Sequence, residues 1–151
     1  MNNKKLPGQL LVEVLIAFAV AALALLAITQ LSTKSLGNAF YASRQTEAVR
    51  YAQAAIETVK DIKKSEGLAA KTNARLTTGG HCYNGSNIST TDANFCQITG
   101  TIYESRVTFI WTTVVTAVGD RSELGILAET RWMNNSTYQT VTQQGVVVFE
   151  N

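Results

Sequence analysis

The feature that most constrains this chain is an apolar stretch near its N-terminus. Leu10 to Ile28 is 19 residues long and contains one polar side chain, Glu13. As an α-helix this stretch spans about 28 Å, close to the ~30 Å hydrocarbon thickness of a bilayer. The short leader before it carries Lys4 and Lys5 and no acidic residue. This charge pattern predicts a cytoplasmic N-terminus and an exported remainder.

Three interpretations of this segment compete: a secretory signal peptide, a plain single-span anchor, and a leader peptide that is cut before the apolar helix. Signal peptides have shorter apolar cores, of about 7–15 residues, which disfavours the first. A plain anchor offers the Glu13 carboxylate no partner, although a carboxylate near one end of a span can also reach the headgroups. Cleavage after Gly8 would instead create an amine at Gln9, about one helical turn from Glu13.

Residues 8–17 read GQLLVEVLIA after a basic leader, and this run resembles the N-terminus of type IV pilins and pseudopilins. The resemblance implies cleavage between Gly8 and Gln9 by a membrane prepilin peptidase and N-methylation of Gln9. It also implies that Glu13 guides docking of each subunit into a filament. Its implied partners are other pilin subunits, the inner-membrane assembly platform and, before assembly, membrane lipid. The family usually has Phe directly after the cut, where this chain has Gln9.

The helix is predicted to continue well beyond the apolar stretch. No Pro or Gly occurs from Gln9 to Leu36, and the sequence predicts one helix over residues 9–66 with a bend near Gly37. Residues 9–29 form its apolar half and residues 30–66 its amphipathic half. In the amphipathic half, apolar residues recur at steps of three and four: Ala48, Val49, Ala52, Ala55, Ile56, Val59 and Ile62. The other face offers three i,i+3 ion pairs, Glu47/Arg50, Glu57/Lys60 and Asp61/Lys64.

Residues 67–100 are rich in Gly, Ser, Thr and Asn, which predicts loop. If they lie outside the cytoplasm, Cys82 and Cys96 are expected to form a disulfide, worth about 3 kcal/mol, unless they pair between molecules. A metal site made by His81 and the two cysteines is the competing idea, disfavoured because structural zinc usually takes four protein ligands. His81 by itself is predicted to be an exposed loop residue.

The remainder predicts β-structure. Ile98–Val118, Leu124–Met133 and Tyr138–Phe149 are dense in β-branched and aromatic residues, and residues 134–136 (Asn-Asn-Ser) suit a hairpin turn. The expected fold class is therefore α+β: a long N-terminal helix with a three- or four-stranded antiparallel sheet packed on its second half. The predicted organisation is a leader over residues 1–8, the two helix halves, and an exported domain over residues 67–151.

Little in the sequence indicates catalysis. No phosphate-binding loop or CxxC motif occurs, the chain has one His, and its 13 basic and 11 acidic side chains argue against nucleic acid as the main partner. We expect no enzyme activity, cofactor or metal. The predicted function is a structural subunit of a type IV pilus or related filament, held in the cytoplasmic membrane with its N-terminus inside and its C-terminal domain outside, and later part of a surface filament. A secretion-system pseudopilin and a membrane-anchored extracytoplasmic binding module are the alternatives.

Overall fold

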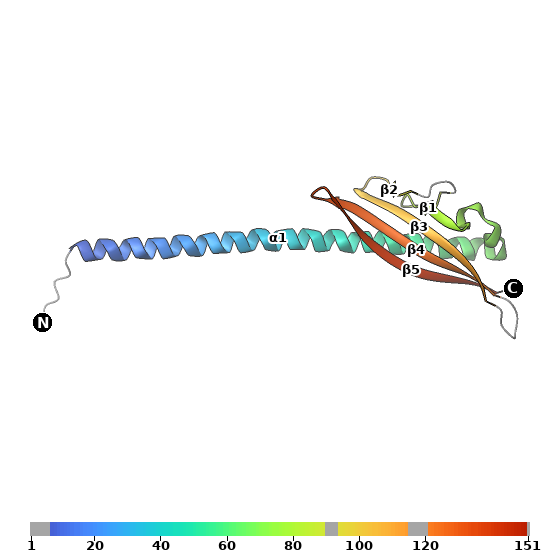
Figure 1. Ribbon diagram of the computed structural model, residues 1–151, viewed down its shortest axis with the longest axis horizontal. Helices are drawn as coiled ribbons and strands as arrows, with labels where there is room; N and C mark the ends of the chain where they lie inside the picture. The colour runs from blue at the N-terminus through green and yellow to red at the C-terminus, as the bar shows by residue number, and fades with distance from the viewer. Residues whose placement is uncertain (1–6, 90–93, 115–120, 151) are drawn as a thin grey trace. The chain divides into compact units, whose positions relative to one another are not determined.

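The computed structural model describes residues 7–89, 94–114 and 121–150. Its fold is α+β, as predicted, and the chain divides into two compact units, residues 1–43 and 44–151 (Figure 1). The regular elements are the helix α1 (Pro7–Glu66), two short 3₁₀ helices (Gly67–Thr72 and Ala74–Leu76) and the strands β1 (Gly79–Cys82), β2 (Cys96–Gln97), β3 (Tyr103–Val114), β4 (Arg121–Asn134) and β5 (Thr137–Glu150).

Helix α1 has clear sequence signals at both ends. Pro7 occupies its first position, where a missing N–H costs nothing and a fixed φ favours the helix. At the other end, Gly67 has a φ of +58° and Lys63 and Lys64 lie in the last turn, a common way for helices to stop. The predicted end at residue 66 is confirmed. The helix runs through Gly37 without interruption.

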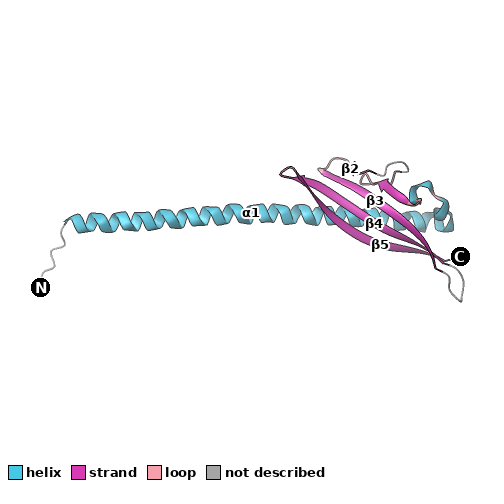
Figure 2. Ribbon diagram, viewed as in Figure 1, coloured by secondary structure: helices cyan, strands magenta, loops and turns pink. Residues whose placement is uncertain are grey.

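The sheet is antiparallel, with the order β1-β3-β4-β5 and with β2 also paired to β3 (Figure 2). The three long strands, β3, β4 and β5, were predicted. Residues 115–118, at the end of the predicted segment Ile98–Val118, lie outside the described residues. The prediction of loop over residues 67–100 was wrong in part, because β1 and β2 lie there and bring the sheet to five strands. These short strands gain their hydrogen bonds from β3, a long-range partner that the local sequence does not show.

A tight turn joins β4 to β5. Asn135 and Ser136 have φ values of +47° and +69°, and Asn134 pairs with Thr137. Two consecutive left-handed residues match the twist of the flanking strands. The predicted hairpin turn is therefore confirmed.

The core of the second unit forms where α1 packs against one face of the sheet. Of the predicted apolar stripe, Ala48, Ala52, Ala55, Ile56 and Val59 are buried. A Cβ built on Gly145 of β5 would lie 2.9 Å from Cγ2 of Ile56, so the glycine allows the helix and strand to approach closely. The large buried side chains supplied by the rest of the unit include Leu76, Tyr103, Val107, Phe109, Leu124, Trp132 and Phe149.

Polar contacts connect the same two layers. The Tyr103 hydroxyl, on β3, donates to Glu47 Oε2 at 2.9 Å. Burial, and then this hydrogen bond, raise the pKa of Tyr103 far above its usual range. Of the three predicted ion pairs on the helix, the described contacts include Glu57–Lys60, with N and O 2.7 Å apart. Glu47, which was predicted to pair with Arg50, accepts the hydrogen bond from Tyr103.

Candidate functional site

The residues predicted to act in processing and assembly share the first turns of α1. Gly8, Gln9 and Glu13 all lie within the helix. Glu13 is four positions after Gln9, which puts both positions on one face with a rise of about 6 Å between them. The Glu13 side chain is exposed. Cleavage after Gly8, methylation of Gln9 and docking through Glu13 stay predictions.

From Val14 to Ile28 the surface of the helix is apolar on every side. All described side chains from Leu10 to Ser43 are exposed, and Phe18 reaches 76% exposure. A helix that is apolar all round is normally covered by lipid or by other protein. The exposed large apolar side chains of this unit are Leu10, Leu11, Val12, Val14, Leu15, Ile16, Phe18, Val20, Leu23, Leu25, Leu26, Ile28, Leu31, Leu36, Phe40 and Tyr41.

The few polar groups along this stretch suit an apolar environment. Thr29 donates its hydroxyl to the Leu26 carbonyl at 2.9 Å, and Thr33 donates to the Gln30 carbonyl at 3.0 Å. Both hydroxyls therefore find acceptors within their own helix. Among the described residues, α1 is long and apolar enough to cross a membrane.

Glu13 and Lys34 bound an uncharged interval of the helix. No charged residue occurs between Glu13 and Lys34, an interval of about 30 Å along a helix. Sequence reasoning did not single out Lys34. Its distance from Glu13, equal to one hydrocarbon thickness, is the signal that would have identified it.

The disulfide predicted between Cys82 and Cys96 is present, with the two Cα atoms 5.6 Å apart. Cys82 ends β1 and Cys96 begins β2, and both strands pair with the same end of β3. The bond therefore fixes two short strands to each other as well as to the sheet. Because the two sulfur atoms are bonded to each other, they are not thiolate ligands of the kind that the competing metal hypothesis requires.

His81 lies in a different environment from the one predicted. We expected an exposed loop residue, but His81 is 3% exposed, on β1, with its ring 5.0 Å from that of Phe109. Its Nε2 lies 2.8 Å from the Thr77 carbonyl oxygen and its Nδ1 lies 2.9 Å from that of Ser89. The prediction was wrong because pairing of β1 with β3 turns this side chain inward. The structure thus gives His81 a packing and hydrogen-bonding role.

No protein-family model, curated protein sequence or solved structure matches this chain. Its architecture is nevertheless pilin-like: a long N-terminal apolar helix, a C-terminal antiparallel sheet that packs on the later part of that helix, and one disulfide in the sheet domain.

Proposed function

We propose that this chain is a structural subunit of a type IV pilus or a related filament. In this proposal the subunit is stored in the cytoplasmic membrane, loses residues 1–8 to a prepilin peptidase, and polymerises through its N-terminal helix. Its β domain lies outside the cytoplasm before assembly and on the surface of the filament afterwards. The proposed role of the protein is to assemble into this filament.

The observation that carries the proposal is the place of Glu13. The carboxylate lies one turn after Gln9 on a helix that has no other charge until Lys34. A carboxylate within a membrane span is costly, by up to about 2.5–3.5 kcal/mol at the helix centre on insertion scales, so it needs a partner or a function. Cleavage after Gly8 would supply that partner as a cationic amine, either on the same chain or on a neighbouring subunit.

The apolar surface of α1 between Val14 and Ile28 supports polymerisation through the same helix. Lipid covers such a surface in the stored subunit, and the helices of other copies would cover it in a filament. Six alanines between residues 17 and 27 offer small side chains, which allow helices to approach closely where burial from water gives no driving force. The disulfide supports an extracytoplasmic position for the sheet domain, because such bonds persist in oxidising compartments.

Substitutions at Glu13 test the proposed mechanism. Glu13→Ala and Glu13→Gln both remove the charge, and Glu13→Gln keeps nearly the same shape. We expect leader cleavage to continue in both variants, while the amount of the chain in sheared surface fibres falls by about tenfold or more, a loss of about 1.4 kcal/mol in docking. Gln30→Ala, a polar-to-apolar change on the same helix, is the matched control and should assemble normally.

Two outcomes would contradict this mechanism. If Glu13→Gln assembled as well as the wild type, the charge of Glu13 would have no part in docking. If fibres from wild-type cells lacked the chain while the full-length protein stayed in the membrane with its leader attached, the membrane-anchored binding module would be the better account.

A further inference from the structure

The second unit has an open sheet edge along β5. Asn134 and Thr137 pair across a two-residue turn, so the odd-numbered residues of β5 exchange hydrogen bonds with β4. The even-numbered residues from 138 to 148 therefore turn their N–H and C=O groups away from β4. Among the described strands, β5 pairs with β4 alone.

Up to its last residue, Glu150, β5 itself carries none of the usual protection against pairing. Proteins guard exposed edges with charged side chains, proline or bulges. Residues 137–149 contain no charged residue and no proline, and their pairing with β4 is continuous. The segment is also rich in Val and Thr, which favour strands. An edge of this kind is ready to accept another strand.

A groove runs between this edge and the C-terminal part of α1. Three adjoining hollows of about 400, 450 and 390 Å³ follow β5 from Gln143 to Glu150. Lys60 and Val146 line both the first and the second hollow. Lys63 and Val148 line both the second and the third. A strand of eight residues extends about 27 Å. The groove therefore follows β5 far enough to take an extended chain of about eight residues.

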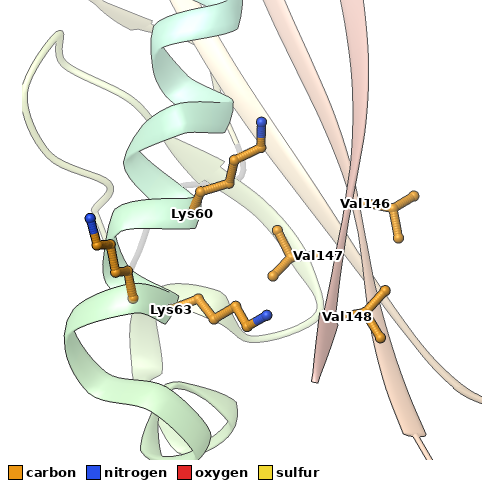
Figure 3. A pocket seen from close by; sticks show the side chains of 6 residues that line it. Lys60, Lys63, Val146, Val147 and Val148 are labelled. Carbon is orange, nitrogen blue, oxygen red and sulfur yellow. The ribbon is translucent and has the colours of Figure 1, made fainter. Parts of the chain in front are cut away.

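The centre of the groove is basic. The middle hollow is lined by Lys60, Lys63, Lys64 and residues 146–148, with no carboxylate among them. Lys60 contacts Glu57, whereas the described residues hold no ion pair to Lys63 or Lys64. Figure 3 shows Val147 on the helix-facing side of β5 and Val146 and Val148 on its other side. The two sides of the edge thus differ in chemistry: lysines on one and valines on the other.

We propose that the β5 edge beside Lys60, Lys63 and Lys64 binds an extended acidic segment of another protein, which adds to the sheet as a further strand. Side chains alternate between the two faces of a strand. Every second residue of this partner meets the lysines and is Asp or Glu. The residues between them lie beside Val146 and Val148 and are apolar and β-branched. Main-chain hydrogen bonds supply affinity and the alternating side chains supply specificity.

Charge favours such a segment over a second copy of this chain. β5 of another copy would bring one acidic side chain to this edge, Glu150 at its very end, whereas an alternating acidic segment brings one at every second residue. The proposal does not depend on leader cleavage or on filament assembly, so either idea can fail without the other.

The direct test uses the full chain in detergent micelles and a fluorescent, end-capped peptide of alternating Val and Glu, with binding followed by fluorescence anisotropy. Replacing Lys63 and Lys64 by Glu should weaken binding by about tenfold or more, since it puts like charges against the peptide. Lys34→Glu makes a similar change outside the groove and should leave binding unchanged. The same peptide with Lys in place of Glu should not bind.

A second pair of variants tests the strand pairing itself. Val146→Pro removes an N–H that faces the open edge and leaves the bonds to β4 in place. It should weaken binding by about tenfold or more, whereas Thr140→Pro, at the same edge but outside the groove, should not. If Val146→Pro fails to fold, methylation of alternate backbone nitrogens of the peptide tests the same hydrogen bonds on the wild-type chain.

Three results would overturn the proposal: no binding of the Val-Glu peptide, equal binding of the methylated peptide, or equal binding by the Lys63/Lys64 variant. Self-association of the chain that Val146→Pro abolishes would also overturn it, because the occupant of the edge would then be a second copy.

Discussion

At the scale of single residues, Tyr103 shows how one side chain joins the helix to the sheet. Its ring packs 5.3 Å from that of Tyr51 on α1, and its hydroxyl reaches Glu47 on the same helix. Ionisation of the phenol would place a negative charge in the core beside a carboxylate. This is why the pKa of Tyr103 is raised.

The raised pKa predicts a loss of stability in alkali. The folded state resists ionisation of Tyr103 while the unfolded state does not, so the stabilisation is complete below about pH 10 and falls as the pH rises further. We expect the melting temperature of the wild type to fall more steeply above about pH 10 than that of Tyr103→Phe. Tyr138→Phe, which changes an exposed tyrosine, should follow the wild type. Parallel curves for wild type and Tyr103→Phe would contradict the account.

Gly145 provides a second test at this scale. A Cβ at this position would meet Cγ2 of Ile56 at 2.9 Å, and overpacking of this kind typically costs about 1–3 kcal/mol. Gly145→Ala should therefore lower the free energy of unfolding by about that amount. In an Ile56→Ala background, where the obstructing methyl is gone, the same substitution should cost little. Equal costs in the two backgrounds would show that the close approach does not limit this position.

His81 shows what local sequence cannot predict for a residue. It follows Gly79 and Gly80 and precedes a segment rich in Asn and Ser, all of which indicate loop. Its burial depends on pairing with Val107, 26 positions later in the chain. The disulfide, by contrast, was predictable because two cysteines in a domain expected to be exported leave one intramolecular pairing.

At the scale of elements, the pattern of apolar and β-branched residues in the sequence predicted the long helix and the three long strands. Helix α1 was predictable from an unbroken apolar run followed by a stripe at steps of three and four. β3, β4 and β5 were predictable from their β-branched residues. The short strands β1 and β2 were not, because four and two residues carry too little pattern. The groove beside β5 was also beyond prediction, since it depends on how far the helix stands from one sheet edge.

The disulfide should stabilise these two short strands most. Closing a loop of this size is worth about 3 kcal/mol, so replacing both Cys82 and Cys96 by Ser should lower the free energy of unfolding by about that amount. Hydrogen exchange should rise first in β1 and β2, which have short ladders, and much less in β4 and β5. Unchanged stability, or loss of protection throughout the sheet at equal rates, would contradict this assignment.

At the scale of the whole molecule, the chain combines a compact, internally packed unit with a helical unit whose apolar surface is exposed. Residues 44–151 bury their own core, whereas the described side chains from Leu10 to Ser43 have no core to enter. The second unit therefore encloses much of its apolar surface itself, whereas the apolar surface of the first suits contact with lipid or with other helices. This division is the physical basis of the proposed filament subunit.

Leader removal would also change the charge of the whole chain. Loss of Lys4 and Lys5 takes the basic side chains from 13 to 11, equal to the 11 acidic ones. A subunit without net side-chain charge can be placed at high density along a fibre without strong self-repulsion.

If proteolysis gives Glu13 its partner, the mass of the mature protein reveals it most directly. Mass spectrometry of the chain purified from membranes and from sheared fibres should find a molecule that begins at Gln9, carries one additional methyl group and retains its disulfide. A mature chain that begins at Met1 or Asn2 in both fractions would contradict the account, because the amine at Gln9 would never form.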